Sequence, residues 1–364
     1  LAADAESIHH LSCHLPMNPL CPSCVLGKGQ VYLKNKGGAT GNDVVAKAKE
    51  FGDLITFDHK ILDSIVKANG TLVTAVVGYD VGSTFRFVMP SKGKTKEETV
   101  VAIRCFLGDQ AVKVVYSDNS KELRSAMQEL RLLHKTSLPH QPRTNSICER
   151  QVAMLNDGVR TLLHRAGLSV MYWSFAAEYF CTAWNFTARN EDGRTPYELR
   201  FNVSPEVLTM IPFGSKVFYR MTTEERRRDL GVFAPTATPG LFLGYHKDDG
   251  CAYRGHVGVV PESWVAANPM IEPHALSINH KQLVLHDCVV FPFHKKVVAD
   301  GVLETATERL LPPPLKTSSG EDRIRDHNWW PQQQNSARAP DVSPELWLHS
   351  SQVDKIAAIR SARE

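Results

Sequence analysis

The order of apolar patterns between residues 51 and 188 limits most strongly how this 364-residue chain can fold. Short alternating or β-branched runs predict strands, and longer stretches with helical periodicity predict helices. Strands are expected at 51–58, 71–79, 84–89, 112–116 and 131–137, and helices at 95–107, 120–130, 145–165 and 170–188. Three successive strands, followed by alternating helices and strands, predict an α/β fold whose mixed five-stranded sheet has helices on both faces.

Three acidic residues stand at the ends of these patterns. Asp58 ends the alternating run 51–58, Asp118 follows the β-branched run 112–116, and Glu149 opens a long helical pattern. Carboxylates so placed can converge on two divalent cations, which activate one oxygen and stabilise the leaving oxygen of a phosphodiester. Mg²⁺ and Mn²⁺ take oxygen ligands, and Mg²⁺ keeps several waters, so three carboxylates suffice. The pattern predicts a metal-dependent phosphoryl-transfer site.

Each of these carboxylates also has an ordinary interpretation. The chain contains 39 Asp and Glu residues, and most acidic side chains are solvated. Glu149 could instead form a capping box with Ser146 at the start of its own helix. The sequence around the three acids favours a site, because three short motifs occur in order. They are Thr56-Phe-Asp58, Tyr116-Ser-Asp118-Asn119 and Pro142-Arg-Thr-Asn145-Ser-Ile-Cys-Glu149-Arg150.

This ordered set resembles the catalytic core of retroviral and LTR-retrotransposon integrases, the D,D-35-E family, and is most similar to copia-type elements. In that family the segment before the glutamate usually reads Pro-x-x-Asn-Gly-x-x-Glu-Arg. Here Ser146 replaces the glycine, and 30 residues separate Asp118 from Glu149. The resemblance implies a ribonuclease-H-like core in which Asp58, Asp118 and Glu149 hold two Mg²⁺ or Mn²⁺ ions. It also implies a polynucleotidyl transferase and DNA endonuclease that performs 3′-end processing and strand transfer.

The N-terminal segment carries two histidines and two cysteines at metal-ligand spacing, namely His10, His14, Cys21 and Cys24. The histidines are four residues apart, so one helical turn would place both imidazoles on one side. With the Cys-x2-Cys pair they predict a tetrahedral Cys₂His₂ zinc site of the structural type. His9 and Cys13 remain possible substitute ligands, and reduced surface thiols are the alternative interpretation. The arrangement resembles the pre-integrase zinc module.

The helix that carries Glu149 has an apolar face and a polar stripe, and a cationic, turn-rich loop precedes it. A plain solvated face and an ordinary surface loop are the alternatives. With Glu149 in a catalytic site, the polar side chains nearby become candidate contacts to the DNA backbone. The predicted DNA-binding residues are Asn119, Arg143, Asn145, Arg150 and Asn156.

Short strands and turns replace the helical patterns after residue 206. This region resembles the small Src-homology-3-type barrel that follows the copia-type core. Its Arg226-Arg-Arg228 run could contact phosphates or remain solvated. The sequence after 301 is rich in Pro, Ser, Gly and Gln, which predicts a disordered tail. The expected domains are 1–40, the zinc module; 45–205, the catalytic core; 206–300, the barrel; and 301–364, the tail.

Composition agrees with these expectations without proving them. The formal net charge is +3 and the pI about 8.4, so charge alone does not reveal a nucleic-acid partner. Eight cysteines are scattered except for one close pair, which favours a reducing compartment and a metal site. The most apolar stretch, 166–184, contains Glu178 and several hydroxyls, so it predicts a buried helix rather than a membrane span. The first residue is Leu1, which suggests a processed polyprotein or a truncated gene model.

The sequence therefore predicts an integrase that acts on double-stranded DNA, both element ends and target. Its expected partners are DNA and further copies of itself, without a membrane, and its expected site of action is the nucleus, with the cytoplasm before import. One alternative is an inactive or domesticated DNA-binding relic. Another is a ribonuclease-H-type nuclease, which needs a further acidic ligand, for which Glu122 and Asp157 are the nearest candidates.

Overall fold

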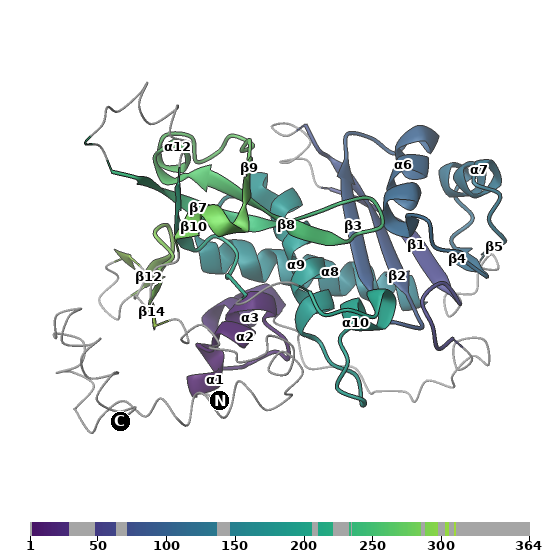
Figure 1. Cartoon of the computed structure of the whole chain (residues 1–364), viewed down its shortest axis with the longest axis horizontal. Coiled ribbons are helices and arrows are strands. Elements are labelled where there is room, and N and C mark those ends of the chain that lie inside the picture. The colour runs from purple at the N-terminus through teal and green to yellow at the C-terminus, as the bar shows by residue number, and fades with distance from the viewer. Residues whose placement is uncertain are drawn as a thin grey trace.

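The fold is described from a computed structural model (Figure 1). The described residues are 2–28, 48–62, 71–136, 146–205, 210–220, 233, 235–284, 288–297, 303–305 and 309–310. Within them the chain forms a small helical N-terminal part, a mixed sheet with helices, and a curled antiparallel sheet. The predicted link 34–42, the Arg226–Arg228 run and the tail beyond 310 lie outside the described residues.

The mixed sheet has five strands in the order β3-β2-β1-β4-β5. They are β1 (Ile55–Ile61), β2 (Thr74–Asp80), β3 (Arg86–Ser91), β4 (Val115–Ser117) and β5 (His134–Thr136). β1 and β2, and β2 and β3, pair antiparallel, whereas β1 and β4, and β4 and β5, pair parallel. This is the ribonuclease-H-like topology, so the predicted fold class is confirmed.

Helices cover both faces of this sheet. The main ones are α6 (Lys96–Leu107), α7 (Lys121–Glu129), α8 (Ser146–Ala166) and α9 (Trp173–Thr187), with a 3-10 turn η2 (Val170–Tyr172) before α9. Successive strand residues point to opposite faces. On β3, the Phe87 ring packs against Phe106 of α6, while the Arg86 guanidinium lies 3.8 Å from the centroid of the Trp184 ring of α9. The two helices therefore lie on opposite sides of the strand.

The N-terminal helices pack on this helical layer. They are α1 (Ala2–Ala5), α2 (Ile8–Cys13) and α3 (Pro22–Lys28). Ser7 caps α2, because its hydroxyl oxygen accepts the His10 N–H at 3.1 Å. α2 contacts α9, and α3 contacts α8. An Arg165–Glu6 ion pair of 3.1 Å further joins α8 to the N-terminal part.

The second sheet is antiparallel, curled, and ordered β10-β6-β7-β8-β9. Its strands are β6 (Lys216–Arg220), β7 (Ala237–Lys247), β8 (Tyr253–Pro261), β9 (Leu276–Asn279) and β10 (Leu283–Val284), with the 3-10 turn η3 (His280–Gln282) between the last two. The smaller elements are α10 (Pro196–Phe201), α12 (Glu262–Ala267), β11 (Cys288–Val289), β12 (Lys295–Val297), β13 (Leu303–Thr305) and β14 (Arg309–Leu310). This half-barrel follows the core, as the sequence predicts.

α9 joins the half-barrel to the mixed sheet. The Tyr179 hydroxyl of α9 donates a 2.9 Å hydrogen bond to the Ile211 carbonyl, and the Ile211 N–H donates one of 2.9 Å to the Tyr245 hydroxyl. Buried apolar side chains of both sheets belong to one continuous cluster, from Phe57 in β1 to Val257 in β8. The two sheets therefore share a hydrophobic core.

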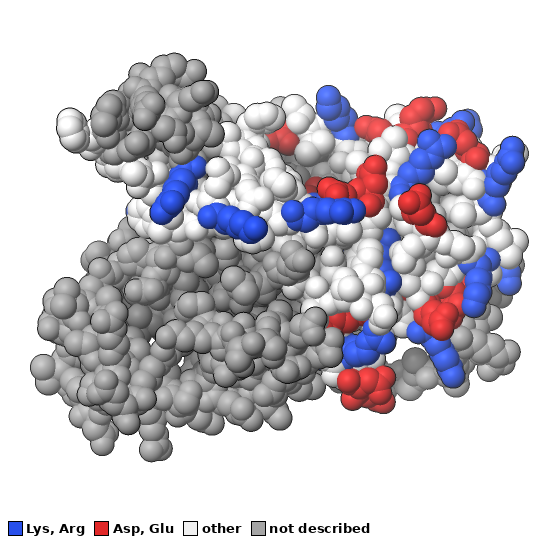
Figure 2. Space-filling model, viewed as in Figure 1, with Lys and Arg blue, Asp and Glu red and all other residues white. Residues whose placement is uncertain are grey.

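The surface carries both charges. On the face shown in Figure 2, acidic and basic side chains are interspersed over the mixed sheet and its helices, and Lys and Arg side chains lie in a row over the half-barrel. This agrees with the formal net charge of only +3. None of the helices within the described ranges is both long and apolar enough to cross a membrane.

Candidate functional site

The predicted zinc ligands come together in the N-terminal part. His10 belongs to α2, and His14 follows its end in the left-handed conformation, with φ of 53° and ψ of 33°. Cys24 lies in α3 and Cys21 immediately precedes it. All four side chains are buried, and one ligand atom from each lies within 4.8 Å of the others.

The distances within this cluster suit a tetrahedral metal site. Cys24 Sγ lies 3.4 Å from His10 Nε2 and 3.5 Å from His14 Nδ1, and Cys21 Sγ lies 3.6 Å from His14 Nδ1. Tetrahedral zinc, with Zn–S near 2.3 Å and Zn–N near 2.0 Å, separates its N and S ligands by about 3.5 Å. The donor set and its spacing therefore fit Zn²⁺.

The protonation of these residues also favours ligation. Burial lowers the pKa of His14 to about 4, so its imidazole is neutral at neutral pH and can donate a lone pair. Hydrogen bonds from Cys24 and from the histidines hold the pKa of the Cys21 thiol below its usual range. The alternative ligand Cys13 lies outside the cluster, and its thiol points to the carbonyl oxygens of His9 and Leu15.

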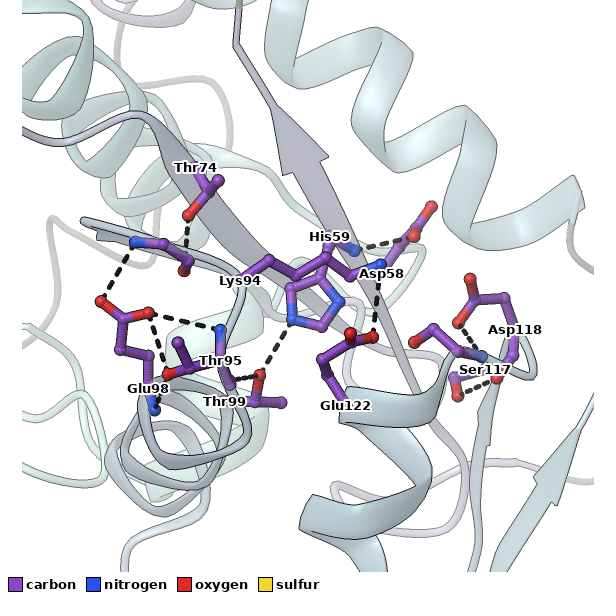
Figure 3. Close-up of polar contacts among 12 residues, drawn as sticks. Asp58, His59, Thr74, Lys94, Thr95, Glu98, Thr99, Ser117, Asp118 and Glu122 are labelled. Carbon is purple, nitrogen blue, oxygen red and sulfur yellow. Dashed lines mark hydrogen bonds and ion pairs between the residues drawn. The ribbon is translucent and has the colours of Figure 1, made fainter. Parts of the chain in front are cut away.

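Asp58 lies on β1, and Asp118 directly follows β4, the strand that pairs parallel with β1. Phe57 of β1 pairs with Ser117 of β4, so Asp58 and Asp118 are each the next residue after a paired one. Neighbouring strands are about 4.8 Å apart, so the two backbones are close at this point. Figure 3 shows the two carboxylates on the same side, that of Asp58 from within β1 and that of Asp118 from just beyond the end of β4.

Burial, with smaller contributions from the charges of Asp118 and Glu149, raises the pKa of the Asp58 carboxyl to about 6. A 2.7 Å hydrogen bond from the His59 N–H and the Lys94 ammonium oppose this shift. Asp118 accepts the Ser120 N–H at 3.2 Å. The site is thus an electrostatically strained group of like charges, which a divalent cation would relieve.

Glu149 lies on α8 and is exposed. Its charge raises the pKa of Asp58. Among the described residues, however, the side chains close enough to hold one metal ion together are His10, His14, Cys21 and Cys24, and not the three carboxylates. In a capping box, the serine is the N-cap, the residue just before the helix, and the glutamate is the third helical residue. Because α8 begins at Ser146, Ser146 is its first residue and Glu149 its fourth, which does not match that arrangement. The convergence of all three acids stays a prediction.

The predicted DNA contacts are only partly described. Asn119 and Arg150 are exposed, and Asn156 is half-buried on α8. Arg143 and Asn145 lie outside the described residues. These assignments stay predictions.

The two further acids proposed for a ribonuclease-H-type nuclease both have cationic partners. Glu122 Oε2 lies 3.6 Å from Lys94 Nζ, and Asp157 pairs with Arg160 one turn further along α8. Glu122 is therefore next to the carboxylate site but engaged by a lysine.

Sequence reasoning missed two residues that the structure places beside Asp58. His59 follows it directly, and its Nε2 lies 3.0 Å from the Thr99 hydroxyl. Lys94 reaches the site from the loop before α6 (Figure 3). The sequence does indicate that Lys94 lies in a loop, because the capping box of Thr95 and Glu98 marks the start of α6 directly after it.

No family model matches the chain. The solved structures similar to it include two of retroviral origin. The crystal structure of the catalytic core domain of BIV integrase has 16% identity and a TM-score of 0.32, covering 41% of this chain and 93% of that one. The cryoEM structure of a simian T-cell lymphotropic virus intasome in complex with PP2A regulatory subunit B56 gamma has 17% identity and a TM-score of 0.32, covering 65% of this chain and 78% of that one. The assignment of the fold therefore rests on the strand order of the two sheets and on the His/Cys cluster of this chain, and not on these two structures.

Proposed function

We propose that this chain is a polynucleotidyl transferase of the integrase type that acts on double-stranded DNA. The observation that carries the proposal is the pairing of β1 with β4, which sets Asp58 and Asp118 side by side, where the charges of Asp118 and Glu149 both act on the Asp58 carboxyl. Carboxylates on or directly after adjacent parallel strands of a ribonuclease-H-like sheet supply the oxygen donors that Mg²⁺ and Mn²⁺ prefer.

In this proposal Asp58, Asp118 and Glu149 hold two divalent cations. When bound, the cations would activate the attacking oxygen and stabilise the leaving oxygen of a phosphodiester. Water attacks first and trims a DNA 3′ end, and the new 3′-hydroxyl then attacks a target phosphodiester. Asn119, Arg143, Asn145, Arg150 and Asn156 contact the DNA.

A Zn²⁺ ion at His10, His14, Cys21 and Cys24 would fix the N-terminal helices in place. A segment of 27 described residues buries too little on its own, and metal binding would supply folding free energy. The zinc would also hold α3 against α8, the helix that carries Glu149.

The finer proposal is that the chain comes from a copia-type retrotransposon, assembles as a homo-oligomer on DNA and acts in the nucleus. The motifs around the three acids support the element type. The proposed domains are the zinc module, 1–40; the catalytic core, 45–205; the barrel, 206–300; and the tail, 301–364.

Incubation of the chain with short duplex DNA and Mn²⁺ or Mg²⁺ tests the activity. We expect 3′-end trimming and strand-transfer products that disappear with EDTA and in Asp118→Asn. Equal product with and without metal would refute the assignment.

A catalytically inactive, DNA-binding relic is the second candidate. It is favoured by the exposure of Glu149 and by the absence of a gathered carboxylate cluster among the described residues. DNA binding without any metal-dependent product, under both Mg²⁺ and Mn²⁺, would select this candidate.

A further inference from the structure

The loop between β3 and α6 is held tightly by its own hydrogen bonds. The Gly93 carbonyl accepts hydrogen bonds from the hydroxyls of Thr74 at 2.8 Å and Ser91 at 3.0 Å. The Glu98 carboxylate accepts the N–H groups of Lys92 and Gly93, each at 3.1 Å. These contacts join the loop to β2, to the end of β3 and to the first turn of α6, so the backbone that leads into Lys94 has little freedom.

From this loop Lys94 extends past His59 toward Asp58 and Glu122 (Figure 3). Its Nζ lies 3.6 Å from Glu122 Oε2, and the two side chains are 30% and 31% exposed. That separation exceeds a normal N–H···O hydrogen bond. A half-exposed ion pair of this kind contributes little to stability, so the ammonium can change partners at small cost.

The position of this ammonium is unusual for a surface lysine. It stands beside acidic side chains that the proposed reaction uses, and its charge opposes the upward shift in the pKa of Asp58. An ammonium has three donors, and DNA presents anionic phosphate oxygens. Placed at the edge of the carboxylate site, Lys94 faces the region where a phosphodiester would have to lie.

We propose that Lys94 is a phosphate-binding residue of this site, whose ammonium contacts an oxygen of the DNA phosphate at or beside the reacting phosphodiester. Glu122 holds the ammonium in place before DNA binds and is exchanged for phosphate when DNA arrives. The inference rests on the proposed function and adds to it a substrate contact and the acid that competes for it.

The chain supplies a matched control. Lys96 Nζ lies 2.7 Å from Glu129 Oε2, and this second pair joins the first residue of α6, two positions after Lys94, to the same helix α7. Glu122 is in the first turn of α7 and Glu129 is its last residue. Seven residues of helix separate the two acids by about 10 Å along the axis. Lys96→Gln therefore removes the same charge and a salt bridge to the same helix α7, away from Asp58.

The first test measures binding of a fluorescent duplex at several salt concentrations, with Ca²⁺ in place of Mg²⁺. We expect Lys94→Gln to weaken binding about ten-fold, as the loss of one hydrogen bond to a charged group does. It should also reduce the salt slope by about one counterion. Lys96→Gln should change neither quantity, and both variants should keep the wild-type thermal unfolding midpoint.

The second test is a double-mutant cycle with Glu122→Gln. Removing the competing acid should strengthen DNA binding when Lys94 is present and do so much less in the Lys94→Gln background. The Lys96–Glu129 cycle should show no such coupling. Equal gains in both Glu122→Gln backgrounds would overturn the exchange of partners.

The outcomes separate this inference from the proposed function. If Asp118→Asn abolishes strand transfer while Lys94→Gln and Lys96→Gln bind DNA alike, the function stands and the role of Lys94 is overturned. If the wild type binds DNA without reacting, yet only Lys94→Gln binds more weakly and with a reduced salt slope, Lys94 binds phosphate and the catalytic proposal fails. A wild-type chain that does not bind DNA overturns both.

Discussion

Gly27 of α3 lies so close to Thr161 of α8 that a Cβ atom at position 27 would stand 2.4 Å from the Thr161 hydroxyl and 3.1 Å from its Cα. The N-terminal helix and the helix that carries Glu149 therefore meet almost backbone to backbone. A change in the zinc cluster can reach the candidate catalytic helix through this contact.

Gly27→Ala should destabilise the protein, although alanine is favoured over glycine in a helix by about 1 kcal/mol. The added methyl meets backbone atoms that cannot rotate away, and overpacking of this kind costs about 1–3 kcal/mol. Denaturant unfolding followed by tryptophan fluorescence measures the net effect. Thr161→Ala in the same chain should restore part of the loss. A Gly27→Ala protein more stable than the wild type would contradict the close packing.

The N-terminal cluster should bind one Zn²⁺ per chain, and Cys24→Ser should lose it. His9→Ala is the matched control, because His9 lies next to His10 but outside the gathered set. Zinc content by elemental analysis after gel filtration, and the unfolding midpoint with and without chelator, give the result. Full zinc content in Cys24→Ser would show that the ligand set is wrong.

Asp118→Asn should abolish 3′-end trimming and strand transfer while DNA binding persists or strengthens, because a metal-binding charge is lost from the DNA-facing site. Asp157→Asn is the control acid, since Asp157 pairs with Arg160 on α8. It should keep wild-type activity. The product yield and the affinity for duplex DNA are measured on the same preparations, and unchanged activity in Asp118→Asn would refute the metal site.

Divalent-metal binding should depend on pH through Asp58. Its pKa in the metal-free protein is raised from 3.8 to about 6, mainly by burial, and only the ionised form binds metal. Mn²⁺ affinity should therefore be nearly constant above about pH 7 and fall about ten-fold per pH unit well below 6. The effect on folding has the opposite sign: the contribution of Asp58 to stability falls as pH rises from about 4 to 6. Calorimetric titrations with Mn²⁺ between pH 5 and 8 check the first statement, and equal affinities at pH 5 and 7 would contradict it.

Arg150→Gln should weaken DNA binding and reduce its salt slope by about one counterion. Arg150 is exposed on α8 directly after Glu149. Arg160→Gln is the comparison, because the Arg160 guanidinium is engaged by Asp157 and by the Asn156 carbonyl. Salt titrations of duplex binding should leave the Arg160 variant unchanged, and equal slopes for both variants would remove Arg150 from the DNA contacts.

Much of the fold could be predicted because its signals are local. The alternating run before Asp58 and the β-branched run before Asp118 each predict a strand, and the structure has a strand at both places. β4 ends at Ser117, just before Asp118, as expected, whereas β1 continues past Asp58 to Ile61. The spacing of the Cys-x2-Cys pair and of the two histidines likewise predicts that these four residues come together, as they do in the structure. Expected strands began a few residues too early, since Gly52 and Arg131, both with positive φ, form turns before β1 and β5.

The partners of these elements could not be predicted in the same way. The position of Lys94 beside Glu122 depends on how α6 packs against α7, which no local pattern encodes. His14 takes a left-handed conformation just beyond α2, so its ring reaches the cysteines by a turn and not by helical periodicity. Long-range packing decides both contacts.

The position of α9 between the two sheets has a consequence for how such a protein can diverge. On α9, Tyr179 packs against Phe213 and Tyr245 of the half-barrel region, whereas Asn185 hydrogen-bonds the backbone of Arg86 in β3. A half-barrel taken from another lineage would not fit unless its residues complemented this one helix. A substitution in either sheet that faces α9 is therefore constrained by the packing of the same helix against the other sheet.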